Sequence, residues 1–220
     1  MDKDTLRKSK AYTVAEEVAH ALTHGIGAIA AIVALIFMLI WAISYGDLFH
    51  VASAIIYGSS LILMYLASTL YHAFPWPRLK AFFQQLDHAA IYILIAGTYT
   101  PFALVNLRGA WGWSLLAVVW GIAFIGVVLE LAMRERKRWL SISLYLGLGW
   151  LAIVVIKPMI ANVDVAGLWL LLAGGLAYTF GVIFYVWKSL RYHHAIWHVF
   201  VLIGSALHFF SIFYYVMPHP

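Results

Sequence analysis

Long apolar stretches make up most of this chain, and only short polar segments separate them. An α-helix needs about 20 residues to cross the roughly 30 Å hydrocarbon core of a bilayer. Seven stretches reach that length, at residues 22–43, 51–72, 86–107, 113–133, 139–160, 166–187 and 195–216. Their apolar character is continuous rather than alternating, which favours helices over the strands of a β-barrel. The sequence therefore predicts an all-α integral membrane bundle of seven transmembrane helices.

Composition and segment length exclude a separate soluble domain. Hydrophobic residues account for 65% of the 220 residues and charged residues for only 10%, which is far more apolar than a soluble domain of this size. The polar breaks are short and contain turn-forming or charged residues, at 44–50, 73–85 and 134–138. We therefore expect residues 1–220 to form one transmembrane domain, which includes a short basic N-terminal segment at about residues 1–13.

Lysine and arginine are distributed unevenly over the polar segments. Arg108 follows the third stretch and Lys157 lies near the end of the fifth, which assigns both to one side. The other 12 of the 14 lie before the first stretch and after the second, fourth and sixth: Lys3, Arg7, Lys8, Lys10, Arg78, Lys80, Arg134, Arg136, Lys137, Arg138, Lys188 and Arg191. Alternate segments share one side of a membrane, and basic segments are retained in the cytoplasm. The pattern predicts a cytoplasmic N-terminus and, after seven crossings, an external C-terminus.

The net charge of +5 indicates which partners the polar segments favour. Basic residues at a membrane surface attract anionic lipid headgroups. Here they are scattered over four short segments with no nucleic-acid recognition module between them. We expect membrane lipid as a partner and no nucleic acid. Glycine-rich helix faces can pack within one bundle or between copies, so the oligomeric state stays open.

Metal-ligand residue types occur in three separate segments, as Ser68 and His72, as Asp87, and as His194 and His198. Residues four apart share one face of a helix. In the predicted topology the three segments all lie at the cytoplasmic end, with Asp87 in the first turn of its helix. Three imidazoles with a carboxylate, bound directly or through water, would complete a tetrahedral Zn²⁺ shell, although the same ligands suit other divalent ions. Ser68 is a poor zinc ligand and is expected to hydrogen-bond a ligand or water.

Other histidines and acidic groups are weaker candidates for this site. His88 and His193 point about 100° away from their neighbours Asp87 and His194 on a helix, so they are second choices. His208 lies ten residues, or about 15 Å, beyond His198, and we expect a hydrogen-bonded core residue there. Outside the site, Glu130 and Arg134 fit a structural ion pair, and Thr13 and Glu16 fit a capping box for a helix that begins near Val14.

Four ordered motifs resemble those of the bacterial hemolysin III proteins, a branch of the progestin and adipoQ receptor family. They are EEVAHALTHGIG (16–27), LASTLYHAFP (66–75), DHAAIYILIAGTYTP (87–101) and HHAIWHVFVLIGSALHFF (193–210). The resemblance covers nearly the whole chain. It implies a multi-pass protein of the bacterial plasma membrane with seven helices and a cytoplasmic N-terminus.

The resemblance also implies a zinc site on the cytoplasmic side, made by three histidines with an aspartate and a serine close by. Transferred by motif, these positions are His72, His194 and His198, with Asp87 and Ser68. One position departs from the pattern, because the family often has asparagine where this chain has His20. The role of His20 is therefore open, and it offers an additional polar partner.

The resemblance implies two unlike functions, both connected with membrane lipid or membrane energetics. In the first, the protein is a zinc-dependent lipid hydrolase, a ceramidase-like amidase in which Asp87 and Ser68 assist catalysis. In the second, it is a non-enzymatic membrane protein with a structural zinc ion that joins helices. A lytic pore is a third hypothesis, which is weaker because few charged residues lie within the apolar stretches.

Overall fold

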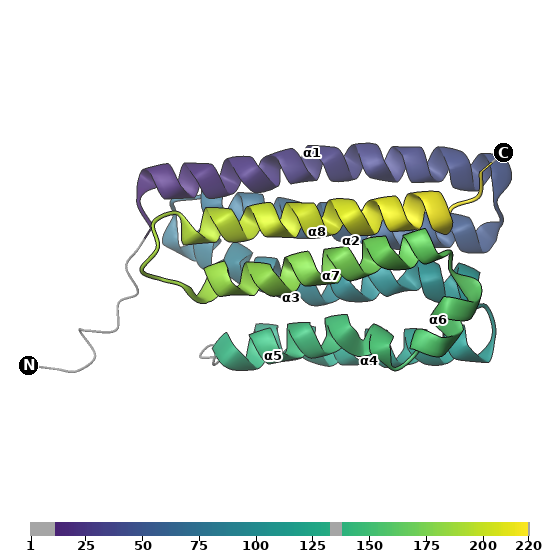
Figure 1. The fold of residues 1–220 in the computed structure, drawn as a ribbon. Helices are drawn as coiled ribbons and strands as arrows, with labels where there is room; N and C mark the ends of the chain where they lie inside the picture. Colours follow the sequence, from purple (N-terminus) through teal and green to yellow (C-terminus); the bar gives the residue numbers. More distant parts are fainter. Residues whose placement is uncertain (1–11, 133–137, 220) are drawn as a thin grey trace, which may run out of the picture.

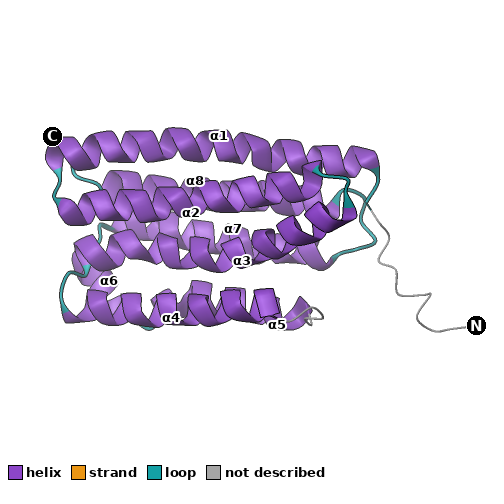
Figure 2. Ribbon diagram, turned by 180° about the vertical axis from the view of Figure 1, so that it is seen from behind, coloured by secondary structure: helices purple, strands orange, loops and turns teal. Residues whose placement is uncertain are grey.

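The computed structural model describes residues 12–132 and 138–219, and these residues form only helices, turns and loops (Figure 2). The order of helices is α1 (Val14–Tyr45), α2 (Leu48–Ala73), α3 (Pro77–Pro101), η2 (Phe102–Asn106), α4 (Ala110–Ala132), α5 (Arg138–Gly149), η3 (Trp150–Ile153), α6 (Ile156–Asn162), α7 (Val165–Val186) and α8 (His193–Tyr215).

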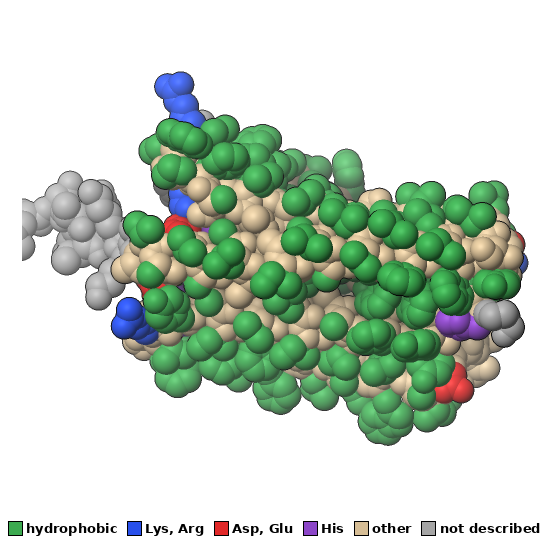
Figure 3. All heavy atoms as spheres, turned by 90° about the horizontal axis from the view of Figure 1, so that it is seen from above, with side chains coloured by type: hydrophobic (Ala, Val, Ile, Leu, Met, Phe, Trp, Pro, Cys, Tyr) green, Lys and Arg blue, Asp and Glu red, His purple; other side chains and the backbone are tan. Residues whose placement is uncertain are grey.

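The helices are long and apolar enough to make this an integral membrane protein. Within the described residues, six spans qualify by length and composition: α1, α2, α3 together with η2, α4, α7 and α8. A seventh is present if α5, η3 and α6 are counted as one bent span. Hydrophobic side chains cover the long middle of the molecule and charged ones gather at its ends (Figure 3). The all-helical bundle is confirmed, with six or seven candidate spans.

The predicted span at 139–160 is not one straight helix. The chain bends by 53° between η3 and α6, where the hydrogen bonds of Val154 and Val155 reach back only three residues. Pro158 explains the break, because proline has no N–H to bond the carbonyl group of Val154 and its ring clashes with that group. The apolar run therefore extends beyond the point at which the straight helix ends.

The prediction of a loop at 73–85 is also wrong, because most of this segment is helical. Only residues 74–76 lie between α2 and α3, and α3 begins at Pro77. Proline suits the first position of a helix, where its missing N–H would have no helical partner. Asp87 is consequently the eleventh residue of α3 rather than part of its first turn, and it lies about 15 Å along the helix axis from Pro77.

Successive long helices run antiparallel, so the polar connections collect at two ends of the bundle (Figure 1). The end where α1 begins also carries Arg78, Lys80, Arg138, Lys188 and Arg191, and we call it the basic end. Arg108 and Lys157 lie in or near the connections at the opposite end. The remaining basic residues of the prediction lie outside the described residues: Lys3, Arg7, Lys8, Lys10, Arg134, Arg136 and Lys137.

Helix α1 begins at Val14, as predicted. Thr13 accepts from the backbone N–H of Glu16, and the Glu16 carboxylate accepts from the backbone N–H of Thr13. This confirms the capping box, which provides partners for two backbone donors that a helix start leaves unpaired. The cap fixes where α1 starts and therefore how far Glu17 and His20 lie from the basic end.

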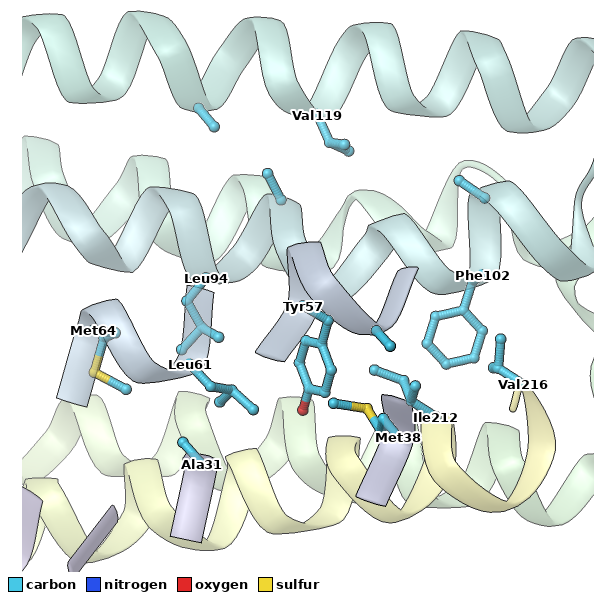
Figure 4. Close-up of a cluster of buried hydrophobic side chains, with 14 of the residues drawn as sticks. Ala31, Met38, Tyr57, Leu61, Met64, Leu94, Phe102, Val119, Ile212 and Val216 are labelled. Carbon is cyan, nitrogen blue, oxygen red and sulfur yellow. The ribbon is translucent and has the colours of Figure 1, made fainter. Parts of the chain in front are cut away.

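The most extensive helix packing joins α1 with α2, α2 with α3 and α7 with α8. Met38, Tyr57 and Ile212 are fully buried where α1, α2 and α8 meet (Figure 4). Gly97 lets α3 approach α2, because a Cβ at this position would lie 2.8 Å from the Cβ of Ser60. In contrast, α5 makes few contacts with α7. The bundle is therefore dense along these helix pairs and open between α5 and α7.

Candidate metal centre

Five histidines from three helices meet near the basic end of the bundle. Helix α1 contributes His20 and His24, α2 contributes His72, and α8 contributes His194 and His198. All five are buried. Each pair on α1 and α8 has the four-residue spacing that places both rings on one helix face. The centre therefore depends on the packing of α1 and α2 against α8.

The three histidines predicted as metal ligands come together. His72, His194 and His198 each offer a ring nitrogen, and these nitrogens lie within 4.8 Å of one another. His72 lies in the last turn of α2, while His194 and His198 open α8. The three buried imidazoles can therefore hold one metal ion.

Hydrogen bonds fix which nitrogen of two ligands carries the proton. The Nδ1 atom of His72 lies 2.7 Å from Oε2 of Glu17, and Nδ1 of His198 lies 3.2 Å from the carbonyl oxygen of His20. Carboxylate and carbonyl oxygens only accept, so both Nδ1 atoms must donate. In neutral rings this leaves the lone pair on Nε2. In metal-binding histidines the ring nitrogen that does not bind the metal typically donates to such an acceptor, which fixes the orientation of the ring.

The centre contains an unusual number of buried ring nitrogens without a hydrogen-bond partner among the described residues. They are Nδ1 and Nε2 of His20, His24 and His194, and Nε2 of His72. Leaving a buried polar group unsatisfied costs about 1–3 kcal/mol, so most such groups in proteins have a partner. A metal ion would provide one for the nitrogens of His72 and His194. The donor set therefore fits a divalent cation that prefers nitrogen ligands, such as Zn²⁺.

Asp87 and Ser68 lie beside the triad without belonging to its ligand group. Both line the same cavity as His194 and His198. The Ser68 Oγ is fully buried and has no hydrogen-bond partner among the described residues. Their predicted roles, as a carboxylate that binds directly or through water and as a hydrogen-bonding hydroxyl, stay predictions.

The histidines ranked lower from the sequence have other partners. His88 Nδ1 lies 3.0 Å from Glu130 Oε1, while Arg134, the predicted partner of Glu130, lies outside the described residues. His193 Nδ1 donates to the carbonyl oxygen of Phe184 near the end of α7. His208 Nε2 donates to the carbonyl oxygen of Leu171, which confirms it as a hydrogen-bonded residue between α7 and α8.

Tyr12 covers the centre from the segment that precedes α1. Its ring lies 4.7 Å from the ring of His20 and stacks on that of His194 at 5.5 Å. Burial raises the pKa of the Tyr12 hydroxyl to about 12, so the phenol stays neutral at physiological pH. An uncharged, aromatic cover separates the imidazoles from the polar surface at this end.

Sequence analysis missed three residues that support the centre: Glu17, Thr23 and His24. Glu17 orients His72, Thr23 Oγ1 lies 3.1 Å from His198 Nδ1, and the His24 ring stacks on that of His198 at 3.5 Å. A signal was present, because His20 and His24 repeat the spacing of His194 and His198, and Glu17 precedes His20 by three residues.

Comparison with known proteins places the chain in a family. The model of the family described as "Haemolysin-III related" matches residues 12–209. The chain belongs to this family. The match spans all five clustered histidines, which lie between His20 and His198.

Relatives within and beyond bacteria support the assignment to the haemolysin III-related family. "Hemolysin-3 homolog" of Bacillus subtilis (strain 168) is 46% identical over 95% of this chain and 98% of its own length. "Hemolysin-3" of Bacillus cereus is 49% identical over 93% and 94%. The human "Monocyte to macrophage differentiation factor" is 30% identical over 79% of this chain and 74% of its own length.

Proposed function

We propose that this haemolysin III-related protein is a zinc-dependent hydrolase of lipid amides that acts in membrane lipid homeostasis. The observation that carries the proposal is the position of His194 and His198, two members of the histidine triad, at the polar end of a cavity sized for a lipid. The cavity has a volume of about 1830 Å³, well above the roughly 300–1,000 Å³ typical of small-molecule pockets.

The lining of the cavity supports an amphiphilic substrate. Tyr12, His194 and Asp87 line it towards the basic end, and Val165 at the start of α7 lines it at the opposite end. Between them the walls are largely apolar and come from α3, α5 and α7, including Ile91, Ile95, Ile142, Leu146, Leu168 and Leu172. An acyl chain would lie along these residues with its polar linkage near the triad.

The chain's own residues can move the protons that amide hydrolysis requires. Bound zinc would polarise the substrate carbonyl group and make water more acidic. The Asp87 carboxylate would accept a proton as water oxygen attacks the carbonyl carbon, and would return it to the amine nitrogen as the C–N bond breaks. The buried hydroxyl of Ser68 would hydrogen-bond the substrate. The products are a fatty acid and an amine.

Replacing Asp87 tests this chemistry. The purified protein in lipid nanodiscs would be incubated with zinc and a panel of ceramides and N-acyl amino acids, and released fatty acid would be measured by mass spectrometry. Because general acid–base catalysis contributes about 100- to 10,000-fold, Asp87→Asn is expected to reduce the rate by that factor.

Asp164→Asn is the matched control, since Asp164 caps α7 at the opposite end and asparagine also caps well. It should keep the wild-type rate. Wild type that carries zinc yet releases no fatty acid from any lipid amide, or releases no more than Asp87→Asn, would contradict the proposal.

We further propose that the basic end faces the cytoplasm of a bacterial plasma membrane. The clustering of Arg78, Lys80, Arg138, Lys188 and Arg191 at that end supports this orientation, since basic segments are retained in the cytoplasm. The zinc centre would then open towards the cytoplasmic leaflet.

Single cysteines can test the orientation, because the chain has no natural cysteine. The substitutions are Ser189→Cys and Ser44→Cys. Ser189 lies between α7 and α8 at the basic end, and Ser44 lies near the end of α1 at the opposite end. Both serines are exposed. In spheroplasts, a membrane-impermeant maleimide is expected to label Cys at position 44 and to label position 189 only after lysis. The reverse pattern would show the opposite topology.

A further inference from the structure

Four of the five clustered imidazoles are arranged as the corners of a nearly regular tetrahedron. The ring centre of His20 lies 4.6 Å from that of His72, 4.9 Å from that of His194 and 5.4 Å from that of His198. Among the triad the distances are 5.2, 5.2 and 4.6 Å. All six edges therefore fall between 4.6 and 5.4 Å.

This spacing is what one tetrahedral metal ion with four imidazole ligands requires. A Zn–N bond is about 2.0–2.1 Å long and the ring centre lies about 1.1 Å behind the nitrogen, so neighbouring ring centres would be about 5 Å apart. The centre of the tetrahedron is equally suited to all four rings. By the position of its ring centre, His20 thus occupies the place of a fourth ligand.

No hydrogen bond among the described residues explains the position of His20. It is fully buried (0% exposed), and neither ring nitrogen forms a hydrogen bond with the described residues. His24 is equally unpaired but cannot take the same role. Its ring lies parallel to that of His198, at an angle of 11° and 3.5 Å away, and two rings stacked in this way cannot both direct a nitrogen at one ion.

We propose that His20 is the fourth ligand of this centre, so that the metal rests in a closed shell of four imidazoles. In the structure a nitrogen of His20 groups with Glu17 and His72, within 4.8 Å, rather than with the whole triad. Binding therefore needs the His20 ring to turn about χ2, a torsion that takes a broad range of values in histidine.

The same grouping does not favour a second cation between Glu17, His20 and His72. A second ion there would need the Nδ1 lone pair of His72, whose Nδ1 instead donates a proton to Glu17 at 2.7 Å. Occupying both nitrogens of His72 would remove that proton and the hydrogen bond that orients the ring. One ion with four imidazoles keeps the bond intact.

A fourth imidazole would also regulate the proposed hydrolase, and this consequence rests on the proposed function. Four protein ligands are typical of structural zinc sites, whereas catalytic sites keep one position open. The His20 imidazole would have to dissociate from the metal before substrate could bind. The Glu17 carboxylate could then accept a hydrogen bond from it, because Oε2 of Glu17 lies 4.0 Å from Nδ1 of His20. His20 would then be the displaceable ligand and the triad the permanent one.

X-ray absorption at the zinc edge tests the ligation directly, because scattering within the imidazole rings reports how many are bound. The wild-type protein in nanodiscs, with zinc content measured by elemental analysis, is expected to hold one zinc ion with four imidazoles. His20→Asn is expected to hold one zinc ion with three. His208→Asn is the control, because His208 lies on α8 but its Nε2 donates to the carbonyl oxygen of Leu171, and this variant should keep four.

Three imidazoles in wild type, an unchanged count in His20→Asn, or two zinc ions per wild-type chain would each overturn the proposal. The wild-type count decides it even if His20→Asn folds poorly. Fatty-acid release by the same samples separates the two proposals. Four imidazoles without turnover in any sample would support His20 as a ligand and reject the hydrolase.

Discussion

Replacing His72, His194 or His198 by alanine is expected to reduce bound zinc from about one ion per chain to background. Each substitution removes one of the three nitrogens that lie within 4.8 Å of one another. The His20 nitrogens do not approach the whole triad, so His20, as the displaceable ligand, would not replace a lost member, and two permanent ligands are fewer than the three of common zinc sites. Elemental analysis of the purified proteins, after dialysis against the same zinc buffer, measures the effect.

His219→Ala is the control for this series. His219 is exposed near the C-terminus and contacts Trp41 and the carbonyl oxygen of Phe213, far from the centre along the bundle. It should retain the wild-type zinc content. Equal zinc in wild type and in all three site variants would refute the metal centre.

The same proteins test whether the ion also holds helices together, as the structural-zinc hypothesis requires. His72 lies on α2 and the other two ligands lie on α8, so a bound ion links two helices far apart in the chain. A ligand present at 100 times its Kd stabilises the folded state by about 2.7 kcal/mol. Zinc should therefore raise the melting temperature of wild type and His219→Ala only. A melting curve that does not change after verified metal loss would exclude this role.

Replacing Glu17 by glutamine is expected to weaken zinc binding by about 10- to 100-fold, the usual cost of losing a partner that orients a metal-binding histidine. The Glu17 carboxylate accepts from His72 Nδ1 at 2.7 Å and from Lys80 Nζ at 2.8 Å. Glutamine has the same shape but no charge, so the charge-assisted hydrogen bond that fixes the His72 ring becomes weaker. Competition with a chromophoric chelator gives the zinc Kd.

Glu16→Gln is the matched control because it makes the same change one residue earlier. The Glu16 carboxylate accepts from Thr13 and from the backbone N–H of Tyr192, and it has no hydrogen bond to His72. It should change the zinc Kd by less than about threefold, which is smaller than the change expected when a histidine loses the partner that orients it. Equal losses in both variants would mean that Glu17 acts through the N-terminal cap or the general charge of the segment rather than through His72.

The sequence alone determined the class of fold and the residues of the triad. Continuous apolar stretches of membrane-spanning length leave few alternatives to a helical bundle, and the spacing of His194 and His198 fixes their common face on any helix. These features depend on composition and local periodicity. The same reasoning failed at Pro158 and Pro77, where proline interrupts one helix and begins another, and therefore misplaced Asp87 within α3.

Only the tertiary structure decided what surrounds the triad. Glu17, Thr23 and His24 acquire their roles because α1 packs against α2 and α8, and no local pattern specifies that neighbour. The four-imidazole tetrahedron depends in the same way on the positions of three helices, which leave the His20 nitrogens without a hydrogen bond to the described part of the chain. Which side chains occur on one helix face is a local property of the chain, whereas which faces meet is decided by packing across the whole bundle.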